Sequence, residues 1–344
     1  MKKVIILLVF ALLLLGAWKI SEVRNKSVSG LSKSMLQEKI ITPTPVPFVE
    51  MTIPHLRSRE YKSEMGGLET LSTNPSYTSF LTSYTSDSLN INSLLTKPTG
   101  QMPQDGWPAI IFIHGYIPPT EYRTTEKYVA YVDSLARSGF VVLKTDLRGH
   151  GSSDGEPGGA YYSSDYIVDV LSAHAALGKL DFVNPKRIGL WGHSMAGNVV
   201  VRTLAVKPDI AASVIWAGAV FTYEDMQKYG LSDNSYRPPL QTSERQRRRQ
   251  KLFDTHGEFD AANAFWETVT PMNYLQDLKG TISLHHAVND EVVSINYMRD
   301  FVPILEKNNV KHEVYEYESG GHNIDGTNFG VAMQRTIDFY KKNL

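Results

Sequence analysis

The fold is decided by the stretch Arg-Ile-Gly-Leu-Trp-Gly-His-Ser-Met-Ala-Gly-Asn-Val-Val-Val at residues 187–201. Its first half is a short apolar run that predicts a buried strand, and its second half predicts an apolar helix. Between the two halves, Ser194 stands in a tight turn flanked by the small residues Gly192 and Ala196. We expect these positions to be small because a larger side chain would clash where the strand and helix backbones nearly touch.

A strand, a tight turn with a central serine and a helix form a nucleophile elbow. Such a turn exposes the Ser194 hydroxyl and leaves the backbone N–H of Met195 beside an oxyanion that forms on a substrate. The pattern G-x-S-x-G ends here in Ala196, with Gly197 one residue later. Alanine has the next smallest side chain after glycine, so we expect the turn to be retained.

Composition narrows the class of protein. With 344 residues, the chain has room for one large or two modest domains, and a hydrophobic share of 42% suits a globular core. A net charge of −1 gives no indication of nucleic-acid binding. The absence of cysteine excludes disulfides, thiolate metal sites and a cysteine nucleophile.

The amino terminus carries a targeting pattern. Lys2 and Lys3 precede an uncharged run at residues 4–18, which Lys19 closes. At about 1.5 Å per residue the run is somewhat short for a bilayer core of about 30 Å, and flanking lysines that snorkel make up the difference. Residues 1–20 therefore predict a signal anchor that leaves the domain outside the cytoplasm. The alternative is a cleaved signal peptide and a secreted protein.

A linker is expected to follow over residues 21–50, ending in the proline-rich segment 42–47. The globular domain is expected over residues 51–344. Strands are predicted at residues 109–113, 140–144, 187–191, 210–217, 281–287 and 311–317, and early antiparallel strands within 77–84 and 89–95. Helices are predicted at residues 128–138, 166–180, 298–307 and 329–344. This alternation predicts an α/β fold with a mostly parallel sheet and helices on both faces.

Residues 221–280 interrupt the alternation and predict a helical lid insertion over the elbow. The insertion includes the arginine-rich run 245–251. A solvated helix face is the ordinary interpretation of such a run. Contact with an anionic membrane surface or with a substrate carboxylate is the alternative.

Several segments resemble one superfamily. The elbow, the His114-Gly115 step and the segment 146–153 resemble the α/β-hydrolases, and residues 270–275 resemble their prolyl oligopeptidase branch of serine peptidases. The resemblance covers about residues 107–344. It implies the α/β-hydrolase fold and a catalytic triad in the chain order serine, acid, histidine.

The resemblance assigns three residues to the triad. Ser194 is the nucleophile, and Asp290 is the acid because it follows the strand 281–287, with Glu291 as the alternative. His322 is the base, on a glycine-rich loop after the last strand. A serine hydroxyl needs such a base, and the base needs an acid that orients it.

Other residues near these positions receive smaller roles. The oxyanion hole is expected to use the N–H of Met195 and a donor from Tyr116, either its N–H or its hydroxyl. His193 is interpreted as structural. The adjacent His285 and His286 face opposite sides of a strand and form a poor pair of metal ligands.

The resemblance implies a serine hydrolase that forms an acyl-enzyme and needs neither a metal ion nor an organic cofactor. A prolyl oligopeptidase-type peptidase is expected, with a carboxylesterase as the alternative and a non-catalytic binding module as a remote one. A peptide or small-molecule substrate and the membrane are the expected partners, and nucleic acid is not. Four aromatic residues are candidates for the substrate pocket, with core packing as the competing explanation: Trp216, Phe221, Tyr223 and Trp266.

Overall fold

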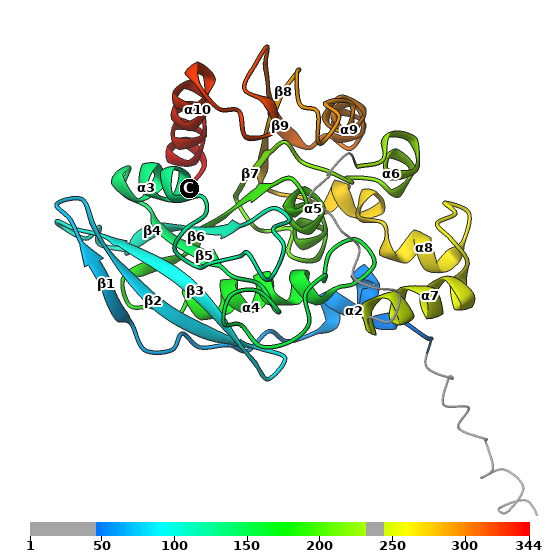
Figure 1. Cartoon of the computed structure of the whole chain (residues 1–344), viewed down its shortest axis with the longest axis horizontal. Coiled ribbons are helices and arrows are strands. Elements are labelled where there is room, and N and C mark those ends of the chain that lie inside the picture. The colour runs from blue at the N-terminus through cyan, green and yellow to red at the C-terminus, as the bar shows by residue number, and fades with distance from the viewer. Residues whose placement is uncertain (1–45, 232–243) are drawn as a thin grey trace, which may run out of the picture. The chain divides into compact units, whose positions relative to one another are not determined.

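The structure is a computed structural model that describes residues 46–231 and 244–344 (Figure 1). All described helices and strands belong to one compact unit, Pro47–Leu344. The expected anchor at residues 1–20 and nearly all of the expected linker lie outside the described residues. Among the residues that are described, none of the helices combines the length and the apolar character that crossing a membrane requires.

Within the described ranges, nine strands form one sheet in the order β1-β2-β3-β5-β4-β6-β7-β8-β9. The first three strands and the contact of β3 with β5 are antiparallel, and all pairs from β5 to β9 are parallel. The strands are β1 Glu69–Thr73, β2 Tyr77–Ser86, β3 Leu89–Pro98, β4 Trp107–Ile113, β5 Val141–Thr145, β6 Val183–His193, β7 Ala212–Trp216, β8 Thr281–Ala287 and β9 Lys311–Tyr317. The predicted mostly parallel sheet is confirmed.

Strands β2 and β3 form an antiparallel hairpin where the sequence predicts early antiparallel strands. Asp87 and Ser88 connect them and have φ angles of 48° and 68°. Two consecutive positive φ angles are the requirement of a type I′ turn, whose twist matches that of the flanking strands. The edge strand β1 is not predicted as a separate strand, because all five of its residues are exposed and leave no apolar pattern.

Helices cover both faces of the sheet (Figure 1). Helices α4, α5 and α9 pack on one face, and α3 and α10 pack on the other. Along β4, Ile111 joins the core of the first face, whereas Ile110 and Phe112 join the core of the second. This burial on both sides explains the unbroken apolar run of the strand. The helices are α3 Val129–Arg137, α4 Asp165–Leu177, α5 Ala196–Val206, α9 Asn296–Lys307 and α10 Thr327–Asn343.

The predicted insertion at residues 221–280 is helical where it is described. It contains α6 Tyr223–Tyr229, α7 Glu244–His256, α8 Ala264–Val269 and the 3-10 helix η2 Pro271–Asp277. Its apolar side chains form a third core with residues from η1 Val49–Met51 and the loop before α4. The third core comprises Met51, Tyr223, Leu252, Phe265, Trp266 and Val269, with Phe48, Tyr162, Phe253 and Phe259 against it.

Two members of the arginine-rich run fasten α7 to the rest of the domain. The guanidinium of Arg248 lies 3.1 Å from the carboxylate of Glu50 and 3.3 Å from that of Asp165. The guanidinium of Arg249 lies 4.4 Å from the centre of the Tyr162 ring. At the end of the helix, the His256 ring hydrogen-bonds to the backbone carbonyl of Pro47 at 2.9 Å. The run therefore contains docking residues as well as a solvated surface.

Candidate active site

The strand order reverses at β4, between β5 on one side and β6 on the other. Strands β4 and β6 are parallel neighbours, with Ile113 opposite Gly192, and β5 lies on the other side of β4. The chain thus leaves β4 toward one side of the sheet and later continues on the other side. In open α/β sheets the carboxyl ends of the strands at such a reversal form the binding crevice. The elbow and the His114-Gly115 step both follow these two strand ends.

Ser194 has the backbone conformation of a nucleophile elbow. Its φ is 56°, in the left-handed region that non-glycine residues seldom adopt. The turn is held because the Ser194 N–H donates to the Trp216 carbonyl at 3.0 Å and the Gly197 N–H donates to the Ser194 carbonyl at 2.9 Å. A Cβ on Gly192 would lie 2.7 Å from Val200, which confirms the predicted need for a small residue there.

Asp290 and His322 form the expected acid–base pair. The ring nitrogen Nδ1 of His322 donates to Oδ2 of Asp290 at 2.8 Å. The other carboxylate oxygen accepts the backbone N–H groups of Val292 and Val293, both at 2.9 Å. Burial raises the pKa of Asp290, but the hydrogen bonds from His286 and His322 outweigh it and hold the pKa well below its usual range. Asp290 is therefore a buried carboxylate that orients the His322 ring.

The loop that carries His322 depends on glycine. His322 lies in η3, Gly321–Asn323, after the last strand β9. Gly320 has a φ of 118°, and a Cβ there would lie 2.8 Å from the backbone of Ile324. The N–H of Gly321 donates to the Asn289 side chain at 2.9 Å, which joins this loop to the loop of Asp290. The conformation of this loop therefore requires glycine at residue 320.

His193 joins the elbow to the loop of His322. Its Nε2 donates to the backbone carbonyl of His322 at 2.9 Å, and the two rings are 4.6 Å apart between centres. His322 is thereby held next to the residue that precedes Ser194. Among the described residues, the Ser194 hydroxyl makes no hydrogen bond to the His322 ring. Catalytic hydrogen bonds are often long in unliganded enzymes and tighten when substrate binds.

The two segments expected to supply oxyanion donors both lie next to Ser194. Met195 is the residue directly before α5, so its N–H belongs to the amino end of that helix. On the opposite side, a Cβ on Gly115 would lie 3.1 Å from the Cβ of Ser194. Tyr116 follows Gly115 and is partly buried against the core. The loop after β4 therefore reaches the nucleophile as the resemblance implied.

Tyr128 is a site residue that sequence reasoning missed. Its hydroxyl accepts the N–H of Gly115 at 3.0 Å and donates to Nδ1 of His193 at 2.8 Å. Burial lowers the pKa of His193 to about 3, so the ring is neutral and its second nitrogen is free to donate to His322. One hydroxyl thus connects the loop after β4, the elbow and the base loop. A tyrosine at the start of a helix carries no sequence signal for this role.

The segment 146–153 contacts the loop that follows β4. Asp146 accepts the hydroxyls of Tyr122 at 2.8 Å and Thr124 at 2.5 Å. Burial raises the pKa of Asp146 to about 6. Arg148 pairs with the buried carboxylate of Asp169 at 2.7 Å. Asp146 and Arg148 therefore have structural roles in this segment.

The four candidate pocket aromatics are packed in the interior. The Trp216 indole donates to Thr336 at 3.1 Å in the core of one sheet face, and the Phe221 ring stacks on Phe301 at 4.4 Å in the core of the other. Tyr223 and Trp266 belong to the third core. All four are at most 2% exposed, so they pack and do not line an open pocket. Core packing, the competing explanation, accounts for each.

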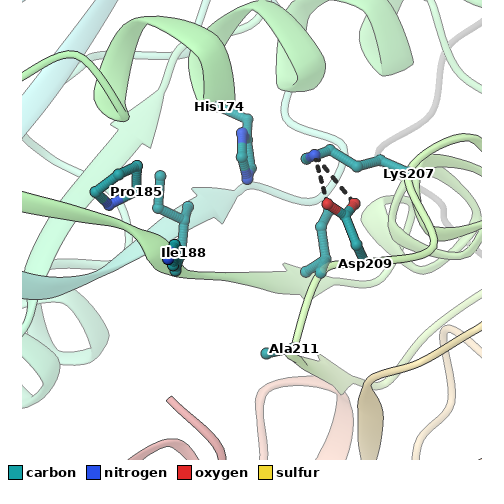
Figure 2. A pocket seen from close by; sticks show the side chains of 8 residues that line it. His174, Pro185, Ile188, Lys207, Asp209 and Ala211 are labelled. Atoms are coloured by element: carbon teal, nitrogen blue, oxygen red, sulfur yellow. Dashed lines mark hydrogen bonds and ion pairs between the residues drawn. The ribbon is translucent and has the colours of Figure 1, made fainter.

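A pocket elsewhere on the domain is separate from this site. Figure 2 shows its lining side chains, which come from α4, from the first residues of β6 and from the segment before β7. These are the amino ends of the two strands, whereas Ser194 follows the carboxyl end of β6. The Lys207–Asp209 ion pair, at 3.0 Å, forms part of the pocket wall. The pocket therefore has no part in chemistry at Ser194.

Comparisons with known proteins agree with this architecture. The family described as "Serine aminopeptidase, S33" matches residues 108–245. The quorum-quenching protein AidA of Acinetobacter baumannii is 27% identical over 131 residues, which are 38% of this chain and 41% of that protein. The match thus spans about two fifths of this relative. It leaves the remainder of that protein uncompared.

Two solved structures share the fold. Dipeptidyl peptidase 4 of Porphyromonas gingivalis has a TM-score of 0.56 and 19% identity, over 78% of this chain and 36% of that one. Acetyl xylan esterase 1 of Thermoanaerobacterium has a TM-score of 0.55 and 20% identity, over 84% of this chain and 91% of that one. Identities this low establish the fold alone.

Proposed function

We propose that this chain, which has the fold of the α/β-hydrolases and matches the serine aminopeptidase family over residues 108–245, is a serine hydrolase that acts through an acyl-enzyme. The observation that carries the proposal is the positive φ of Ser194 after the carboxyl end of β6, together with the 2.8 Å contact of Asp290 and His322. Ser194, Asp290 and His322 span 128 positions of sequence, and the loops that carry them follow β6, β8 and β9 at the same edge of the sheet. Core packing alone requires neither the strained serine nor the buried carboxylate.

The proposed reaction gives each of these groups one role. Ser194 Oγ attacks the substrate carbonyl while Nε2 of His322 takes its proton. The negative charge that forms on the carbonyl oxygen is stabilised by the N–H of Met195 and by a donor from the loop of Tyr116, each worth about 3–4 kcal/mol. His322 then protonates the leaving group, and water releases the acyl group by the same steps in reverse order. Asp290 stabilises the charged His322 throughout.

Peptide hydrolysis is the first candidate for the substrate class. It is supported by the serine aminopeptidase family over residues 108–245 and by the shared fold of dipeptidyl peptidase 4. Ester hydrolysis is the second candidate, supported by the alignment with acetyl xylan esterase 1 over 84% of this chain. Both reactions pass through the same tetrahedral oxyanion, so the triad does not separate them. Turnover of aminoacyl anilides against short acyl esters of 4-nitrophenol does.

A fluorophosphonate probe tests the mechanism without knowledge of the substrate. We expect covalent labelling of the full chain at Ser194 and none of the Ser194→Ala variant, with the site located by peptide mass spectrometry. Labelling at another serine, or no labelling of a folded protein, would leave the chain as a non-catalytic member of the fold.

We also propose that residues 1–20 anchor the domain outside the cytoplasm. The support is the uncharged run between Lys3 and Lys19. Membrane fractionation of cells that express the full chain, followed by carbonate washing, tests the anchor. Recovery of a shortened amino terminus in the soluble fraction indicates cleavage instead.

A further inference from the structure

A second histidine contacts the carboxylate of the acid–base pair. His286 lies near the end of β8, four residues before Asp290, and its Nε2 is 3.0 Å from Oδ2 of Asp290. This is the same oxygen that receives Nδ1 of His322 at 2.8 Å. The side chains of His286 and Asp290 are both fully buried. Two imidazole groups therefore share one carboxylate oxygen away from solvent.

We propose that His286 is a positioning residue that fixes the Asp290 carboxylate and limits how strongly Asp290 stabilises protonated His322. The inference rests on the proposed function, because it concerns the base of the same reaction. A hydrogen bond to a carboxylate spreads part of its negative charge over the donor. A carboxylate oxygen that already accepts one N–H is therefore a weaker partner for a second.

The hydrogen-bond pattern assigns the proton of His286. Its Nε2 lies near two acceptors, Oδ2 of Asp290 and the backbone carbonyl of Val293 at 2.9 Å, so Nε2 carries hydrogen. Its Nδ1 is buried and has no hydrogen-bond partner among the described residues. A proton on Nδ1 would be a buried donor without an acceptor, which costs about 1–3 kcal/mol. The packing thus favours a neutral ring that donates toward Asp290.

Two other titratable groups near His286 are Glu316 and His193. Glu316, on β9, interacts electrostatically with His286 and is paired with Arg299 of α9 at 2.6 Å. His193, on β6, also interacts with it and is held neutral by burial. Within the part of the chain that the structure describes, the other titratable groups at this contact are Asp290 and His322. Oδ2 of Asp290 is therefore the acceptor through which a change at His286 reaches the base.

The neighbouring residue supplies a matched control. His285 is equally buried on the same strand but faces the other side of the sheet. Its nitrogens contact the hydroxyls of Ser283 and Tyr317, both at 2.9 Å, and it does not touch Asp290. Replacing either histidine removes a buried imidazole from β8, but only the replacement of His286 removes a hydrogen bond to the Asp290 carboxylate.

The test is the pH dependence of fluorophosphonate labelling of the full chain. His286→Met and His286→Phe remove the N–H donor, and we expect the midpoint of the acid limb to move to higher pH by about 0.5–1 unit. The direction follows because a carboxylate freed of one donor stabilises protonated His322 more strongly. His286→Gln retains an N–H donor, and we expect its midpoint to stay within about 0.2 unit of the unmodified protein. The two donor-free variants provide a second chance if one of them fails to fold.

The outcomes separate the inference from the function on which it rests. Absence of labelling in the unmodified protein overturns the proposed function itself. If that protein is labelled and folded donor-free variants keep its midpoint, the sharing of Oδ2 has no effect and the inference is wrong. An equal shift in His285→Leu has the same consequence, because a general loosening of β8 would then explain the result.

Discussion

Replacing Asp290 by asparagine tests the geometry of the acid directly. The Asp290 carboxylate accepts four N–H groups, two from the backbone of Val292 and Val293 and two from His286 and His322. An asparagine amide has only one oxygen. The two backbone groups, each at 2.9 Å, cannot turn away, so the amide oxygen takes their side. The amide NH₂ then faces two histidine N–H donors.

The expected consequence is a reversal of the His322 tautomer. Because an NH₂ group offers no acceptor, Nδ1 of His322 must give up its proton and accept a hydrogen bond instead. The proton then lies on Nε2, the nitrogen that has to take the proton of Ser194. An exchange of this kind lowers the rate of a serine protease about 10⁴-fold while its geometry is kept. We expect a loss of the same order from Asp290→Asn.

The assay is the second-order rate of fluorophosphonate labelling at pH 8. Urea unfolding of the same preparation identifies a loss that comes from misfolding. Asn289→Asp serves as the control, since it changes the neighbouring side chain by the reverse exchange. A folded Asp290→Asn protein that reacts within tenfold of the unmodified rate would refute the assignment of Asp290 as the acid.

Three further changes have defined outcomes. Ser194→Gly removes a side chain from a residue with a φ of 56°, so we expect its free energy of unfolding in urea to exceed that of Ser194→Ala by about 1 kcal/mol. Neither variant should be labelled by the probe. Tyr128→Phe leaves the N–H of Gly115 and Nδ1 of His193 without their shared hydroxyl, so we expect about 1–3 kcal/mol less stability and slower labelling, measured by urea unfolding and by the probe. The raised pKa of Asp146, about 6 against 3.8, means that the folded protein binds the proton more tightly, so stability falls as pH rises from 4 to 6. Asp146→Asn should remove this slope, of up to about 1.4 kcal/mol per pH unit, in urea titrations across that range.

The parallel part of the fold is predictable because its strands are buried on both faces. The predicted bounds 281–287 and 311–317 are those of β8 and β9. Strand β6 begins earlier than predicted, at Val183, which pairs with Trp107. The more exposed residues 184–187 separate Val183 from the apolar run that the sequence shows. Periodicity detects apolar runs and does not detect a strand start of this kind.

The chain order of the triad is predictable from motifs, but the surrounding contacts are not. His286 precedes Asp290 by four residues, a spacing that makes two side chains neighbours on a helix but not along a strand. Their contact here depends on how the loop of Asp290 folds back. Tyr128 meets His193 across 65 positions of sequence. The aromatic residues show a different limit, because composition does not distinguish a ring that packs from one that lines a pocket.

The docking of α7 bears on where the chain can be shortened. Phe48 packs in the third core, Glu50 pairs with Arg248, and the carbonyl of Met51 accepts Arg202 at 3.0 Å. These contacts lie within the first few residues of the compact unit, next to the segment that the sequence assigns to a linker. A protease cut just after Pro47 would leave these three contacts in place. A cut after Ser58 would remove all three residues, and with them the contacts that hold the helical insertion. Expression trials of a trimmed protein therefore have little freedom at this end.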